Sequence, residues 1–145
     1  MNVKAILAAK KKLGGDIISI EPTADLATAA KLLSKHRIGS VVILGAGERL
    51  IGILSERDIV RAVSEQGAGA LALPVGQVMT RDVATCGEDD TVASIMERMT
   101  AGRFRHMPVV ANGRLVGLIS IGDVVKLRVE EIEGESQAMR DYIAH

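Results

Sequence analysis

Apolar residues along this chain fall into short blocks, and the period of each block predicts a secondary structure element. Runs of Ile and Val without internal charge indicate strands. Apolar residues spaced three and four positions apart, such as Leu26, Ala29, Ala30 and Leu33, indicate an amphipathic helix. The first half predicts, in order, a strand at 16–20, a helix at 25–36, a strand at 40–44, a strand at 50–54 and a helix from Ser55 to about residue 65.

The same order of elements begins again after a flexible Gly- and Ala-rich link at 67–70. The second half predicts a short helical turn at 74–79, a strand at 83–86, a helix at 92–101, a strand at 107–110, a strand at 115–119 and a helix from Ser120 to about residue 143, with or without a break. Asn112-Gly113 between the last two strands is typical of a hairpin turn. Each half therefore predicts the order β-α-β-β-α.

A sequence pattern marks the same place in each half. Residues 52–58 and 117–123 both read Gly-x-x-Ser-x-x-Asp, 65 positions apart. Because each half has too few residues to bury both faces of its own sheet, we expect the halves to pack together with pseudo-twofold symmetry. Any cleft between them would then occur twice.

The Ser-x-x-Asp part of this pattern has two interpretations. Ser55 and Ser120 stand where a helix begins, so each serine and the aspartate three residues later can cap free backbone N–H groups. The same groups suit a nucleotide, since a serine can donate to a phosphate and Asp58 or Asp123 can accept hydrogen bonds from a ribose diol. The glycine ahead of each pair allows close approach to the backbone.

The residues before the second buried strand make the two halves unequal. Arg105 and His106 stand where the first half has Gly39 and Ser40. Arginine offers a forked donor set for phosphate, although a solvated loop is an equally simple interpretation. We therefore expect two unequal sites, one strongly cationic and one neutral.

Composition narrows the class of protein. The 145 residues carry a formal net charge of zero, with 48% hydrophobic and 25% charged residues, which is typical of a globular chain and argues against a nucleic-acid binder. No apolar run is long enough to span a membrane or to act as a secretory signal. With Cys86 as the one cysteine, no intrachain disulfide can form, and we expect a cytoplasmic protein.

Taken together, these motifs resemble a tandem pair of CBS domains, also called a Bateman module. The supporting segments are 18–22, 38–42 and 52–58 in the first half, and 78–80, 105–110 and 117–123 in the second. The resemblance implies an α+β fold of two β-α-β-β-α repeats with helices on the sheet faces. We expect an N-terminal lead-in at 1–15, repeat 1 at 16–66, a linker at 67–73, repeat 2 at 74–127 and a helical tail at 128–145. The first repeat departs from the second where Val42 stands in place of Pro108.

The resemblance also implies ligands and site residues. CBS pairs bind AMP, ADP or ATP, sometimes NAD(H) or S-adenosylmethionine, and form homodimers. In the family each cleft is built from both repeats. The first cleft would use Ser55, Asp58, Arg105, His106 and the backbone near Met79 and Ala84. The second would use Ser120, Asp123, Gly39, Ser40 and the region of Ile18, so the resemblance implies that the Asp123 site lacks a basic partner. If one cleft alone is filled, we expect it to be the one at Asp58.

We therefore expect a non-catalytic regulatory module that senses adenine nucleotides and acts through dimer geometry on an unknown protein partner. No catalytic set or metal-ligand spacing is visible in the sequence, and no cofactor is required. The alternative is an oligomeric scaffold with vestigial clefts, whose motif serines and aspartates are caps only. A small nucleotide-acting enzyme is a weaker alternative, because His106 is its one candidate base.

Overall fold

The computed structural model describes residues 1–12 and 17–144, and the chain divides into two compact units. Unit 2 comprises Ile17–Ala84 and Asn112–Val116, and so contains the first predicted repeat. Unit 1 takes its described residues from Met1–Asp16, Thr85–Ala111 and Gly117–His145. The first twelve residues of the chain therefore belong with the second repeat.

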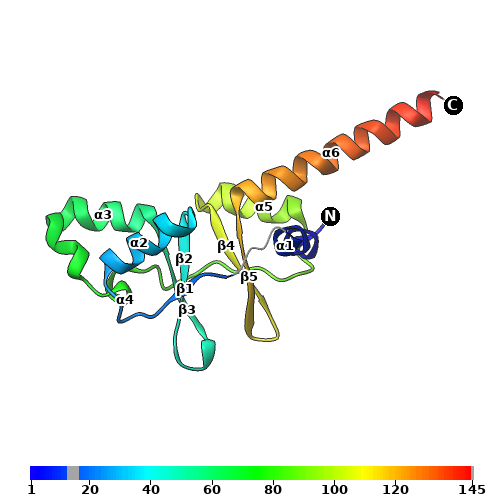
Figure 1. The fold of residues 1–145 in the computed structure, drawn as a ribbon. Helices are drawn as coiled ribbons and strands as arrows, with labels where there is room; N and C mark the ends of the chain where they lie inside the picture. Colours follow the sequence, from blue (N-terminus) through cyan, green and yellow to red (C-terminus); the bar gives the residue numbers. More distant parts are fainter. Residues whose placement is uncertain (13–16, 145) are drawn as a thin grey trace. The chain divides into compact units, whose positions relative to one another are not determined.

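Unit 2 follows the predicted order closely (Figure 1). Its elements are β1 (Ser19–Ile20), α2 (Leu26–His36), β2 (Ser40–Leu44), η1 (Ala46–Glu48), β3 (Leu50–Ser55), α3 (Glu56–Gln66), η2 (Gly67–Ala72) and α4 (Val75–Val78). The sheet has the order β1-β2-β3, with β1 parallel and β3 antiparallel to β2. The predicted strand at 16–20 is shorter than expected, and its Asp16 lies outside the described residues.

Local sequence explains where α2 begins and ends. The Asp25 side chain accepts a hydrogen bond from the backbone N–H of Thr28 at 2.8 Å, which caps the first turn. Arg37 ends the helix in the left-handed conformation, with φ 54°. Arg103 ends the corresponding helix of unit 1 with φ 55°, so the duplication extends to backbone conformation.

The core of unit 2 lies among α2, the two long strands and the segment that follows α3. The buried residues are Leu26, Ala29, Leu33, Val41, Ile43, Leu54, Ala62, Ala70, Val75 and Met79. Ala70 is fully buried inside η2, so the prediction of a flexible link at 67–70 is wrong. The small side chains of this segment allow it to pack closely beside α3.

Unit 1 contains α1 (Val3–Lys12), α5 (Val92–Gly102), β4 (His106–Ala111), the second part of β5 (Arg114–Ser120) from Gly117 on, and α6 (Ile121–Ala144). The first three residues of β5 cluster with unit 2. β4 and β5 form a two-stranded sheet, and the turn joining them has positive φ at Asn112 and Gly113, as the hairpin prediction requires. α6 runs without a break for 24 residues. The core of unit 1 contains Val3, Ile6, Cys86, Val92, Ile95, Met99, Met107, Val109, Ile119 and Val124.

The N-terminal helix α1 is the counterpart of α4, displaced by 72 positions. The Val3 N–H donates to Asp90 O at 2.9 Å, as the Val75 N–H donates to Ala24 O at 2.7 Å. The Val92 N–H likewise donates to the carbonyl of Met1. Val3 and Ile6 are buried in the core of unit 1, so the segment expected to be a lead-in is a structural part of that unit. Figure 1 shows α1 (dark blue) next to α5 and α6.

The strand predicted at 83–86 is wrong. The segment forms a single parallel bridge, in which the Cys86 N–H donates to Pro108 O and the Val110 N–H donates to Cys86 O. Proline has no N–H, so the ladder cannot continue to Ala84. In unit 2, Val42 stands in place of this proline. Its N–H donates to the carbonyl of Ile18, the residue equivalent to Ala84, at 3.4 Å, which explains why β1 forms there.

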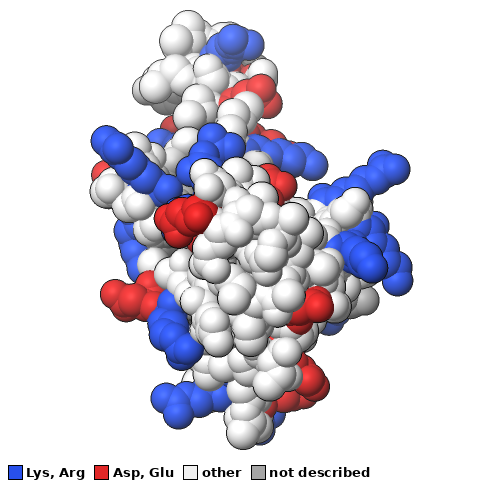
Figure 2. Space-filling model, turned by 90° about the vertical axis from the view of Figure 1, so that its left-hand side faces the viewer, with Lys and Arg blue, Asp and Glu red and all other residues white. Residues whose placement is uncertain are grey.

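Unit 2 exposes several hydrophobic side chains along α3 and η2, namely Val60, Val63 and Leu71. Figure 2 looks onto this end of the unit and shows an uncharged centre with Lys, Arg, Asp and Glu around it. Within residues 1–12 and 17–144, no helix combines the length and apolar character needed to cross a bilayer.

Candidate functional site

The first Gly-x-x-Ser-x-x-Asp motif sits where β3 turns directly into α3. Ser55 is the N-cap, and its Oγ accepts from the Asp58 N–H at 3.3 Å. In return, Asp58 Oδ2 accepts from the Ser55 N–H at 2.9 Å and from its hydroxyl at 3.2 Å. This reciprocal capping box satisfies two backbone donors, so the capping interpretation of the motif is correct at this position.

Only one of the two carboxylate oxygens of Asp58, Oδ2, accepts the hydrogen bonds of the cap. The residue is 6% exposed, and its second oxygen, Oδ1, lies 3.5 Å from Nη1 of Arg61, whose side chain is 66% exposed. An exposed arginine contributes little to a pair of this kind, because it can exchange its partner for water or for a ligand. Asp58 therefore combines a fixed position with one oxygen able to accept further hydrogen bonds.

The second motif forms the same cap at the start of α6. Asp123 Oδ2 accepts from the Ser120 N–H at 2.8 Å, and Ser120 Oγ accepts from the Asp123 N–H at 3.2 Å. These distances differ little from those at Ser55 and Asp58, so the local sequence fixes the local geometry in both units.

Lys10 distinguishes the second motif from the first. Its ammonium Nζ lies 3.0 Å from Asp123 Oδ2 and 2.5 Å from the carbonyl oxygen of Leu118. The expectation that Asp123 lacks a basic partner is therefore wrong. Burial of Asp123 raises its pKa, but hydrogen bonds from the Ser120 backbone and from Lys10 outweigh burial and hold the pKa below its ordinary value.

The strand residue two positions before each serine is used differently in the two units. In unit 2, Ile53 exchanges backbone hydrogen bonds with Thr80, at 3.0 and 2.9 Å. In unit 1, the carbonyl of the corresponding Leu118 accepts the Lys10 ammonium. The cause is helix length, since α4 ends at Val78 and releases Thr80 into extended backbone, whereas α1 continues to Lys12.

The glycine of each motif allows a close approach, but the group that approaches belongs to the protein. A Cβ at Gly52 would lie 2.5 Å from Met79 Sδ and 3.0 Å from Thr80 O, and one at Gly117 would collide with Leu7 Cδ2. Met79 and Leu7 are equivalent under the shift of 72 positions. The glycines therefore allow α4 and the residues after it to approach Gly52, and α1 to approach Gly117.

The residues before β2 and before β4 differ in side chain, but their backbone makes the same hydrogen bond in both units. The carbonyl of Arg105 accepts from the Ile121 N–H at 2.7 Å, and that of Gly39 accepts from the Glu56 N–H at 2.9 Å. Arg105 is exposed, whereas His106 is half-buried at the start of β4.

Ser40 occupies the position equivalent to His106, at the start of β2. It is 1% exposed, and its Oγ has no hydrogen-bond partner within the described part of the chain. A buried hydroxyl without a partner is uncommon in folded proteins.

The predicted site residues fall in both units. Ser55, Asp58, Met79, Ala84, Ile18, Gly39 and Ser40 belong to unit 2, while Arg105, His106, Ser120 and Asp123 belong to unit 1. Their grouping into shared clefts stays a prediction. Lys10 and Thr80 were not identified from the sequence as neighbours of these motifs, although the likeness of residues 3–7 to 75–79 was a usable signal.

Two further kinds of site were considered from the sequence, a metal site and a reactive cysteine. Among the residues that the structure describes, no group of three or more His, Cys, Asp or Glu could hold a metal ion. Cys86 is buried in the core of unit 1, and burial, followed by the nearby Asp90 charge, raises the pKa of its thiol to about 11. Such a thiol is nearly all protonated at neutral pH, so it is not a nucleophile there.

Comparison with known proteins identifies the fold. A CBS-domain-containing protein from Agrobacterium tumefaciens is 46% identical, with a TM-score of 0.82 over 88% of this chain and 92% of that one. The CBS-domain pair of protein MJ0100, solved in complex with 5′-methylthioadenosine and S-adenosyl-L-methionine, is 27% identical, with a TM-score of 0.77 over 90% of this chain and 98% of that one.

A curated relative, an uncharacterized 17.7 kDa protein from Acidianus ambivalens, is 37% identical over 74% of this chain. This chain spans 64% of that relative's length. The sequence matches the CBS domain family twice, over residues 10–65 and 75–130. The duplicated capped motif, the α+β order of elements and these matches together show that the chain belongs to the CBS domain family, as a tandem pair.

Proposed function

We propose that this chain is a non-catalytic regulatory module that binds an adenosine-containing ligand, AMP, ADP, ATP or NAD(H), at the start of α3. Ser55 and Asp58 would contact its phosphate and ribose, and Arg105 and His106 would contact the phosphates. Binding would act through the geometry of a homodimer on a protein partner in the cytoplasm.

The observation that carries this proposal is the difference between the partners of the two carboxylate oxygens of Asp58. Its Oδ2 is held by the cap, and its Oδ1 has an exposed arginine as neighbour. A ribose diol needs a fixed acceptor of this kind. The adenosine compounds bound by the CBS pair of MJ0100 support the choice of ligand class. At Asp123 the corresponding carboxylate is already paired with Lys10, so we propose that this second position is empty in the unmodified chain.

Isothermal titration of the full chain with AMP, ADP, ATP, NADH and S-adenosylmethionine tests the proposal. The decisive variant is Asp58→Asn, because the amide oxygen can still cap Ser55 while the NH₂ group replaces the second acceptor. We expect an affinity at least about tenfold weaker, with little change in thermal stability. Asp123→Asn is the matched control and should leave the affinity unchanged.

Stoichiometry gives a second measurement on the same protein. We expect one ligand per chain, rising to two in Lys10→Met, where Leu118 O and Asp123 are released. An absence of heat with all five compounds, or equal affinities of the chain and of Asp58→Asn, would overturn the proposal. The scaffold alternative, in which both motifs are caps only, would then be preferred.

A further inference from the structure

The C-terminal helix α6 carries an apolar stripe that is separate from its core-facing side. Ile121, Val124 and Leu127 pack into the core of unit 1. The stripe runs along another side and consists of Val125, Val129, Ile132, Met139 and Ile143, with Ser136 as its one polar member. The exposed fractions of its hydrophobic members lie between 38% at Val125 and 75% at Ile143.

The spacing of the stripe is that of a coiled coil. Counted from Val125, its positions advance by four, three, four, three and four residues, which is the a/d alternation of a heptad repeat. Val129, Ser136 and Ile143 take the a positions. The stripe is about 28 Å long at 1.5 Å per residue.

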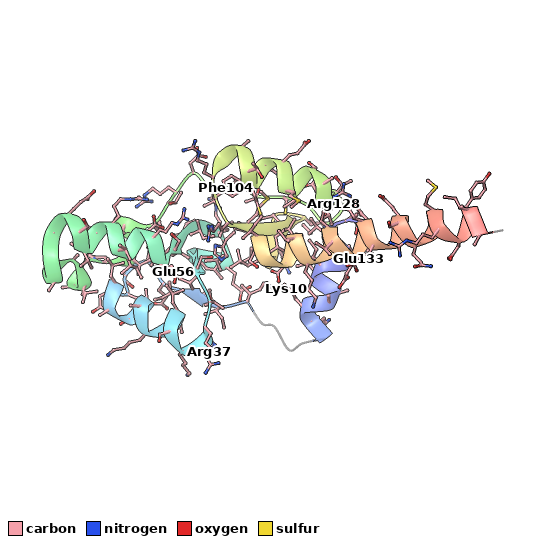
Figure 3. The ribbon with its side chains drawn as sticks, turned by 90° about the horizontal axis from the view of Figure 1, so that it is seen from above. Lys10, Arg37, Glu56, Phe104, Arg128 and Glu133 are labelled. Carbon is pink, nitrogen blue, oxygen red and sulfur yellow. The ribbon has the colours of Figure 1, made fainter. Side chains whose placement is uncertain are left out.

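The part of α6 that carries most of this stripe extends beyond the rest of unit 1. Figures 1 and 3 both show its last turns running past α1 and α5, and Figure 3 shows the side chains of these turns lying away from those helices. A lone helix with an apolar stripe of this length requires a partner surface to remove it from water.

The charged residues beside the stripe identify that partner and its direction. Arg128 and Glu135 occupy g positions, and Glu133 and Arg140 occupy e positions. In a parallel pair, each g residue faces the e residue five positions later on the other helix. Arg128 would then face Glu133 of a second copy, and Glu135 would face Arg140, on both sides of the seam.

Antiparallel pairing with the same overlap has the opposite result. Glu133 would face Glu133, Glu135 would face Glu135, and Lys126 would lie near Arg140, so each flanking pair of two charged residues would have like charges. Arg128 would lie near the uncharged Tyr142. In the single chain, Arg128 pairs with Glu131 three residues later, which leaves its other N–H groups for a second helix. Figure 3 labels Arg128 and Glu133 on this helix.

We propose that residues 125–143 of α6 pair with the same segment of a second copy of this chain as a parallel, in-register, two-stranded coiled coil. The self-complementary charges favour a second copy over an unrelated helix. The small polar Ser136 at a central a position favours one register. The pairing does not depend on ligand binding at Asp58, so the ligand titration and the cross-linking experiment can fail separately.

Cysteine cross-linking of the full chain tests direction and register. Val129→Cys and Ser136→Cys each place a thiol at the seam, opposite its own counterpart. Gly134→Cys places one on the outer side of the same helix. Native Cys86 is buried and has a raised pKa, so it does not compete at neutral pH. We expect intermolecular disulfides to form at least about tenfold faster in both seam variants than in the control.

Two results of this cross-linking would overturn the proposal. The first is a Gly134→Cys variant that cross-links as fast as the seam variants. The second is a Val129→Cys variant that does not cross-link to itself, since an antiparallel pair would place its counterpart near Met139.

Sedimentation equilibrium tests the interface without a cross-link. Ile132→Asp adds a charge at the seam, and Gly134→Asp adds the same charge outside it. We expect the first to weaken dimerization at least roughly tenfold and the second to have little effect. Equal masses for wild type and Ile132→Asp would overturn the proposal, whether both are monomers or both dimerize through another surface such as that of Val60 and Leu71.

Charge reversal provides a final check of direction. Glu135→Arg and Arg140→Glu should each weaken the dimer, and the double variant should restore it, because the g–e′ pair is rebuilt with reversed signs. Circular dichroism should show equal helix content in all three variants. A double variant that is no better than either single variant would contradict the parallel arrangement.

Discussion

The two helix starts of this protein carry the same motif and form the same cap, yet they differ in chemistry. Asp58 N to Ser55 Oγ is 3.3 Å, and Asp123 N to Ser120 Oγ is 3.2 Å. Asp58 retains an oxygen beside an exposed arginine, whereas Asp123 is held by the ammonium of Lys10. A duplicated motif therefore fixes local geometry, and the segment that packs beside it determines what the carboxylate can do.

The largest expected effect tests whether α1 takes the place of α4 in unit 1. Ile6 is 2% exposed in the core that also holds Cys86. Ile6→Ala should lower the free energy of unfolding of unit 1 by about 2–5 kcal/mol, because it leaves a cavity. Lys4→Ala, at an exposed position on the same helix, is the control.

Labelling of the Cys86 thiol measures this effect in unit 1 alone, since unit 2 has no cysteine. We expect faster labelling in Ile6→Ala at intermediate urea concentrations. Labelling of Ile6→Ala at the wild-type rate would show that α1 does not stabilise unit 1 and so is not the equivalent of α4.

A smaller effect compares the two motif glycines. Gly52→Ala should cost about 1–3 kcal/mol of stability in urea denaturation, since its Cβ would press on Met79 and on the Thr80 carbonyl. Gly117→Ala should cost less, because the group it meets is the flexible end of Leu7. If Gly117→Ala cost more stability than Gly52→Ala, the contact of Gly52 with the Thr80 backbone would not be more rigid than the contact of Gly117 with Leu7.

The smallest effect concerns pH and the ion pair of Asp123. Because the pKa of Asp123 is lowered in the folded chain, its contribution to stability is present above the ordinary value of 3.8 and is lost as pH falls through the folded-state pKa. Lys10→Met removes one lowering cause, so this loss should begin at a higher pH.

At neutral pH the same variant should cost at most about 1 kcal/mol, since the pair is partly exposed. Lys11→Met, at an exposed neighbouring position, should leave the acid limb of the stability curve unchanged. NMR titration of the Asp123 carboxylate gives the shift directly, and an unaltered titration in Lys10→Met would exclude the pair as its cause.

Much of the fold follows from short-range pattern. The helix at 26–36, the strand at 40–44 and the turn at Asn112-Gly113 depend on period, capping and turn chemistry within a few residues, and all three are confirmed. The strand expected at 83–86 fails because its partner strand contains Pro108, which lacks the donor that the ladder needs.

By itself, the sequence determined the two repeats and the capped Ser-x-x-Asp motifs, because each depends on residues close together in the chain. The tertiary structure alone decided that α1 packs into the second repeat and brings Lys10 to Asp123, 113 positions away. That contact depends on burial of Val3 and Ile6 and on a helix continuing past the point where α4 ends. Local pattern does not specify which apolar surface a helix will cover, so the difference between the two aspartates arises only when the chain is folded.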